Sequence, residues 1–150
     1  MHEVKIELID ESINISSRGI VSGNLFFDFG IFQFPERSWN DAIIIVIDWW
    51  LKALVEFVGS DAATAELGFM DGPFVLLMRR DSGNQCQFLC LEGPCRRELF
   101  KCRGSAMDLL RSAVAVSTRL LRICGRNGWQ SSNIDSIGEL VKIARTYTKV

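Results

Sequence analysis

Two kinds of apolar spacing alternate along the chain and predict its secondary structure. Apolar and polar residues alternate over residues 3–10 and 20–34, which predicts half-buried strands. Short apolar runs joined by Gly-containing connectors follow after residue 60, and such connectors predict hairpins. The predicted hairpin strands are residues 64–70, 74–80 and 85–92, followed by a basic edge strand at 96–103.

The longest apolar stretch, residues 35–58, predicts one helix that is buried on several sides. Ser38 lies three residues before Asp41, the spacing of an N-terminal cap. The charges of this helix recur on one stripe roughly a quarter of its circumference wide. Because charges recur every turn, we expect burial inside a domain and no membrane span. The stripe contains Asp41, Ile45, Asp48, Lys52 and Glu56.

Two further helices are predicted near the end of the chain. Ser105 with Asp108, and Ser132 with Asp135, repeat the capping spacing before runs of helically spaced apolar residues. The order is therefore strands, helix, strands, helix, helix. This order predicts one α+β domain over residues 1–150, with a mainly antiparallel sheet of about five to seven strands packed with three helices.

The charged residues are distributed unevenly between the two halves of the chain, and the cysteine content bears on the cellular compartment. Residues 1–75 hold four Lys and Arg against twelve Asp and Glu, and the rest of the chain holds thirteen against six. We expect the two halves to neutralise each other or to present faces of opposite sign. An odd number of cysteines, five, and a charged start without a signal peptide predict a cytoplasmic protein.

Catalytic and cofactor motifs are absent from the sequence. There is no glycine-rich phosphate loop and no C-x-x-C pair, and the single histidine, His2, lies at the amino terminus. Asp48 with Glu66 or Asp71 would supply a two-carboxylate site, but we expect a solvated stripe instead. We therefore expect no catalytic residue, no cofactor and no metal ion, and the protein is predicted not to be an enzyme.

Cysteines and arginines offer two alternatives. Cys86 and Cys90 are expected in the core, whereas Cys95 and Cys102 lie among basic residues, which can lower the pKa of a thiol. A thiol-dependent enzyme or sensor acting through residues 95–103 is thus one alternative. Arginines also line one face of the helix after residue 106, but we expect them to pair with the acidic half and not with nucleic acid. They are Arg111, Arg119, Arg122 and Arg126.

The segments FPERSWND, IIIVIDWW and LGFMDGPFVLLMRR, in this order, resemble the layout of small cytosolic immunity proteins from bacterial polymorphic toxin systems, including contact-dependent growth inhibition. The resemblance implies a non-catalytic inhibitor that binds a cognate toxin domain, such as a nuclease, and occludes its active site. A cytosolic secretion chaperone is a further alternative, and the oligomeric state stays open. The expected partner interface comprises Asp41, Ile45, Asp48, Lys52, Glu56, Asp61, Glu66 and Asp71.

Overall fold

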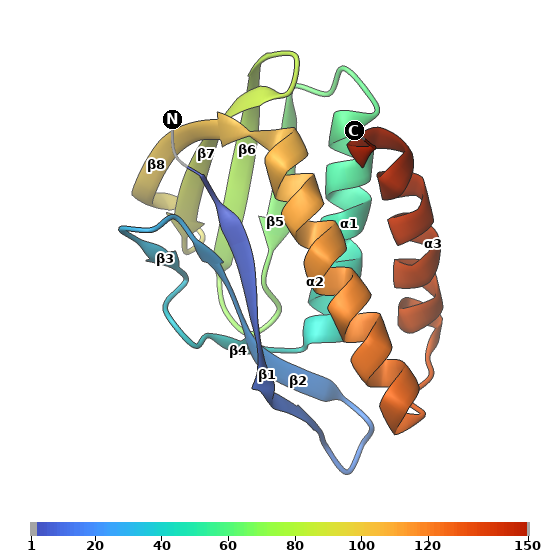
Figure 1. Ribbon diagram of the computed structural model, residues 1–150. Coiled ribbons are helices and arrows are strands. Elements are labelled where there is room, and N and C mark those ends of the chain that lie inside the picture. The colour runs from blue at the N-terminus through green and yellow to red at the C-terminus, as the bar shows by residue number, and fades with distance from the viewer. Residues whose placement is uncertain (1–2, 150) are drawn as a thin grey trace.

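The structure is a computed structural model that describes residues 3–149. Over these residues two antiparallel four-stranded sheets pack with three helices, which confirms the predicted α+β class (Figure 1). The first sheet contains β1 (Lys5–Ile15), β2 (Val21–Asp28), β3 (Gln33–Phe34) and β4 (Asn40–Asp41). The second contains β5 (Thr64–Gly68), β6 (Phe74–Ser82), β7 (Gln85–Glu92) and β8 (Arg97–Ser105). The helices are α1 (Ile43–Val58), α2 (Ala106–Asn127) and α3 (Ser132–Thr148).

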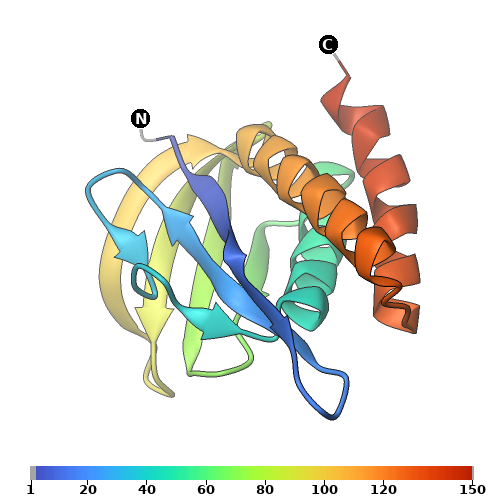
Figure 2. The ribbon, with the colours of Figure 1, turned by 60° about the horizontal axis from the view of Figure 1, so that its bottom comes forward.

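The strands are divided between two sheets, where the sequence predicted one. In the first sheet β2 pairs with β1, β3 and β4, and α1 then carries the chain away to begin the second sheet, ordered β5-β6-β7-β8. In that sheet β6 is central and β8 lies at an edge, as predicted. The second sheet curves, and the first lies across its inner side (Figure 2). Phe29 joins the two sheets, since its ring contacts those of Phe88 and Phe100.

Helix α1 lies at the centre of the fold. It contacts β2, β5, α2 and α3. The Trp50 ring stacks on Phe27 with 4.4 Å between centroids, and its Nε1 donates to the carbonyl oxygen of Gly68 at 2.7 Å. Apolar contact on several sides explains why this helix needs so few polar residues. The predicted burial of this helix on several sides is confirmed.

The start of α1 differs from the prediction. The helix begins at Ile43, its N-cap is Ala42, and no side chain caps it. Ser38 instead adopts a positive φ of 65°, and Asn40–Asp41 form β4 against β2. The sequence spacing suited a cap, but pairing with β2 holds the backbone extended until Asp41. Ser38 is therefore not a helix cap.

The two later helices begin with serine caps. Ser105 Oγ accepts from the backbone N–H of Asp108, as predicted, and α2 ends at Gly128 with a left-handed φ of 68°. Helix α3 is capped one residue earlier than predicted, because Ser131 and not Ser132 accepts from the backbone of Ile134. Both helices pack on α1 and on each other.

Arg80 on β6 secures the end of α1. Its Nη2 donates to the carbonyl oxygens of Phe57 and Ser60, and its Nε donates to that of Ala62 at 2.9 Å. The guanidinium also lies 3.9 Å from the centroid of the Phe57 ring. One side chain thus satisfies carbonyls that the helix end and the following loop leave open. None of the helices within residues 3–149 is both long and apolar enough to cross a membrane.

Candidate functional site

Asp48 lies inside the protein, where the sequence predicted a solvated stripe. It is 0% exposed, and its carboxylate accepts hydrogen bonds from Ser136 Oγ at 2.6 Å and from Asn133 Nδ2 at 2.9 Å, both on α3. Lys52 Nζ lies 3.2 Å from the same carboxylate. The prediction that Asp48 contacts a partner is wrong, because α3 packs over this side of α1 and uses the carboxylate to hold itself in place.

Asp41 is also fully buried, and its carboxylate organises a loop. It accepts from the backbone N–H groups of Ala42, Met70 and Asp71 and from Trp39 Nε1, at 2.7 to 3.2 Å. These bonds tie the start of α1 to the β5–β6 connection. Burial and the Asp41 charge raise the pKa of the exposed Asp71. Asp41 is therefore a structural residue and not a partner contact.

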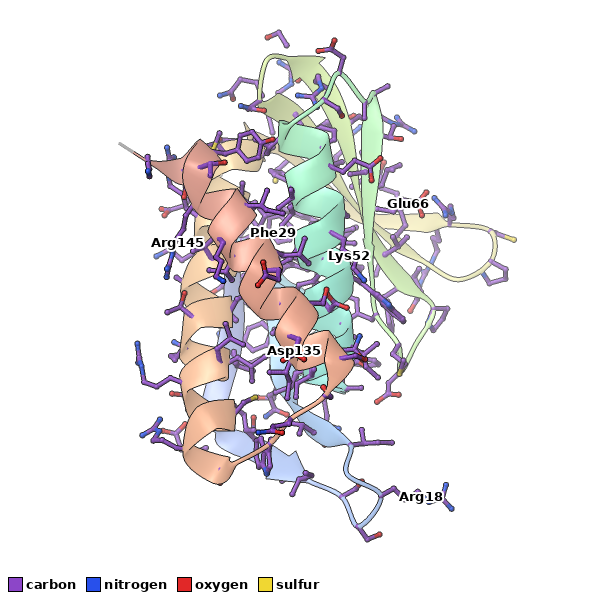
Figure 3. All side chains as sticks on the ribbon, turned by 90° about the vertical axis from the view of Figure 1, so that its right-hand side faces the viewer. Arg18, Phe29, Lys52, Glu66, Asp135 and Arg145 are labelled. Carbon is purple, nitrogen blue, oxygen red and sulfur yellow. The ribbon has the colours of Figure 1, made fainter. Side chains whose placement is uncertain are left out.

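The exposed stripe of α1 shares Ile45, Lys52 and Glu56 with the predicted one, but it contains Trp49 where the prediction had Asp48. Along it run Ile45, Trp49, Lys52 and Glu56, which we call the α1 surface stripe; Ile45 is half-buried and the other three are exposed. Trp49 is 42% exposed, an uncommon position for the largest side chain. Figure 3 faces this side of the molecule, with α1 between α3 and β5. The stripe thus runs along the open side of α1, between α3 and β5.

A shallow depression of about 170 Å³ separates α1 from β5. It is lined by Ala53, Glu56 and Phe57 of α1 and by residues 62 and 64–66. Glu66 turns outward and forms a two-bond pair with Arg96 of the β7–β8 connection, the shorter bond 2.7 Å long. Lys52 and Glu66 are labelled in Figure 3, one on each side of this groove.

Five of the predicted contacts keep the exposure that an interface requires, namely Lys52, Glu56, Asp61, Glu66 and Asp71. Within residues 3–149 neither Glu56 nor Asp61 has an ion-pair partner. The imagined two-carboxylate site is not formed, because the oxygens of Asp48 and Glu66 are occupied by α3 and by Arg96. Asp71 is exposed in the β5–β6 connection beside the buried Asp41.

The cysteines are mostly shielded from solvent. Cys86 and Cys90 are buried, as predicted, and burial raises the pKa of the Cys86 thiol from 9.0 to about 12. Burial also raises the pKa values of Cys90, Cys102 and Cys124. The expectation that the pKa is lowered is wrong for Cys102, since desolvation by burial is the largest contribution and raises it. Cys95 is the exposed cysteine of the described chain.

The arginines of α2 are partly used within the fold. Arg119 lies 3.1 Å from Asp10 and donates to the carbonyl oxygen of Leu8, so it joins α2 to β1 as the charge asymmetry predicted. Arg111 pairs with Asp108 on its own helix. Residues 3–149 contain no cluster of three or more His, Cys, Asp or Glu side chains arranged to hold a metal ion. His2 lies outside the described residues.

Sequence reasoning missed two residues of this region. Trp49 stands among apolar residues and is not in the predicted stripe, although its position four residues after Ile45 and three before Lys52 is on the same face. Arg80 ends the predicted strand 74–80, and nothing in the sequence pattern indicates its contacts with the end of α1. Comparison with known family models, with curated proteins and with solved structures found no match to this chain.

Proposed function

We propose that this protein is an immunity protein, which binds a toxin domain in the bacterial cytoplasm and blocks its active site without turnover. The observation that carries the proposal is the α1 surface stripe with Trp49 exposed at its middle. Tryptophan is the side chain most enriched among residues that dominate binding energy at protein interfaces. A half-buried apolar neighbour, Ile45, and flanking charges give this stripe the apolar centre and polar rim of an interface.

Several groups that catalysis could use are buried or hydrogen-bonded within the fold. The carboxylates of Asp41 and Asp48 are saturated with internal hydrogen bonds, and burial raises the pKa of four thiols. The depressions near the stripe have volumes of only about 170 and 130 Å³, which is too small to enclose most small substrates. These features support binding over chemistry.

Electrostatics favour a basic partner. The positive charge of Lys52 is neutralised by the buried carboxylate of Asp48. Glu56 and Asp61 have no ion-pair partner within residues 3–149. The charges left unpaired on the stripe and at the adjoining Asp61 are therefore acidic. A nuclease domain, whose substrate-binding surface is basic, matches this charge, and complementary charge accelerates association.

Titration of toxin activity tests the proposal. The toxin domain encoded beside the gene for this protein is purified, and its activity is measured while the chain is added. We expect activity to fall linearly to zero at one chain per toxin, with both proteins recovered intact from the complex. Full toxin activity in the presence of excess chain would refute the proposal.

A further inference from the structure

The outer edge of β5 carries unpaired backbone groups. Arg80 N donates to Ala63 O at 2.8 Å and Phe69 N donates to Phe74 O at 3.2 Å, and the β5–β6 register between these pairs has no bulge. In an antiparallel ladder alternate residues face the neighbouring strand. Residues 63, 65, 67 and 69 therefore bond to β6, and the N–H and C=O groups of Thr64, Glu66 and Gly68 face away from it.

Part of this outer edge is already capped. Gly68 O accepts from Trp50 Nε1, and Ala62 O accepts from Arg80 Nε. Between these two caps lie Thr64 and Glu66, and both residues line the depression beside α1. The open edge is thus a short stretch with a defined beginning and end.

The two edges of this sheet are protected differently. The other edge strand, β8, presents exposed Arg97, Lys101 and Arg103, and such charges discourage pairing with another strand. Strand β5 has no basic residue and no proline. Its edge therefore lacks the basic residues and the proline that discourage an added strand, although Trp50 of α1 caps one end of it.

We infer that an extended segment of the toxin domain, with basic side chains at alternate positions, adds to the second sheet along the Thr64–Glu66 edge of β5. This inference rests on the proposed function and specifies how the partner is bound. Backbone bonds to Thr64 and Glu66 supply the affinity, as in other strand-addition complexes. Glu56, which lines the same depression, and Asp61, just before β5, supply the charges that select basic side chains.

Amide hydrogen exchange, followed by NMR on the ¹⁵N-labelled full chain, tests the edge directly. The probe is an end-blocked hexapeptide of alternating Lys and Val, and its control alternates Glu and Val. We expect the Lys-Val peptide to slow exchange of the Thr64 and Glu66 amides at least tenfold and the control to leave them unchanged. No slowing, or equal slowing by both peptides, would overturn the inference. Slowing with protein concentration alone would assign the edge to a second copy of this chain and also overturn it.

Variants separate backbone pairing from charge. Thr64→Pro removes an outward N–H without breaking a bond to β6, and Thr64→Val keeps that N–H. We expect the first to abolish peptide protection of Glu66 and the second to retain it, with unchanged circular dichroism for both. Glu56→Lys should weaken Lys-Val binding several-fold, whereas Glu98→Lys on the opposite edge strand should not. Unchanged protection in Thr64→Pro would contradict strand addition.

The complex with the toxin domain distinguishes this inference from the proposed function. If the toxin is inhibited and the Thr64 and Glu66 amides become protected, both stand. Inhibition without protection of these amides refutes strand addition and leaves the proposed function intact. Absence of inhibition refutes the proposed function. The peptide experiment then tests by itself whether the edge of β5 pairs with an added strand.

Discussion

Ser136 on α3 donates a 2.6 Å hydrogen bond to the buried carboxylate of Asp48 on α1. With Asn133, it fixes α3 against the central helix through a polar contact inside an otherwise apolar interface. Because a buried carboxylate is costly unless its oxygens are satisfied, this contact sets how α3 docks.

Removing this carboxylate should destabilise the protein. Asp48→Ala leaves the Asn133 and Ser136 donors without their acceptor, so we expect the free energy of unfolding to fall by about 2–3 kcal/mol. Urea denaturation measures this change. Asp61→Ala, at an exposed acid of the same half, serves as the matched control and should change stability by less than about 0.5 kcal/mol. Equal stability of Asp48→Ala and the parent protein would contradict the assignment.

Arg80→Lys should also destabilise the protein. A lysine keeps the positive charge but cannot reach the carbonyls of Phe57, Ser60 and Ala62 together, because only the guanidinium carries donors along a planar fork. We expect a loss of about 2 kcal/mol in thermal or denaturant unfolding. Arg79→Lys, at the exposed neighbour on the other face of β6, is the control and should be nearly neutral. If Arg80→Lys left the stability unchanged, the positive charge alone would secure the end of α1, and the role given to the guanidinium would be wrong.

The pKa of Asp28 should depend on Gln33. The hydrogen bond from Gln33 Nε2, with that from the Gly30 N–H, lowers the pKa of Asp28 below 3.8. Gln33→Ala should therefore raise this pKa, as measured by NMR of the carboxyl carbon. A lowered pKa stabilises the fold above pH 3.8 and ceases to do so as the pH falls through the folded value. The stability difference between the two proteins should accordingly shrink below pH 3.8. Asp71, whose pKa is raised mainly by burial, should not respond.

Thiol reactivity should be confined to one cysteine. Cys95 is exposed, whereas burial raises the pKa of the other four thiols. We expect a disulfide reagent at pH 8 to modify one thiol quickly in the native protein and all five in guanidinium chloride. Cys95→Ser should remove the fast phase. Rapid reaction of a second thiol in the native protein would contradict this prediction.

Local spacing predicted the elements well where neighbours in sequence decide the structure. Strand Gln85–Glu92 and the Ser105 cap have the predicted bounds, since alternation and capping are local properties. Asp41 and Asp48 were misplaced because their partners, the backbone of Met70 and the side chain of Ser136, lie 29 and 88 residues away. A helical wheel gives the angle between residues but not which neighbouring element covers each face. The exposed stripe could be placed only once α3 was known to pack over Asp48.

The affinity of the Trp49→Ala variant for the toxin domain tests the central claim most directly. Trp49 and Ile143 are matched in exposure, at 42% and 45%, but lie on α1 and α3 respectively. We expect Trp49→Ala to weaken binding by about 30-fold or more and Ile143→Ala to leave the dissociation constant unchanged, with equal unfolding midpoints for both. If the parent protein inhibits the toxin domain and Trp49→Ala binds that domain with the same dissociation constant as the parent, the central claim is contradicted.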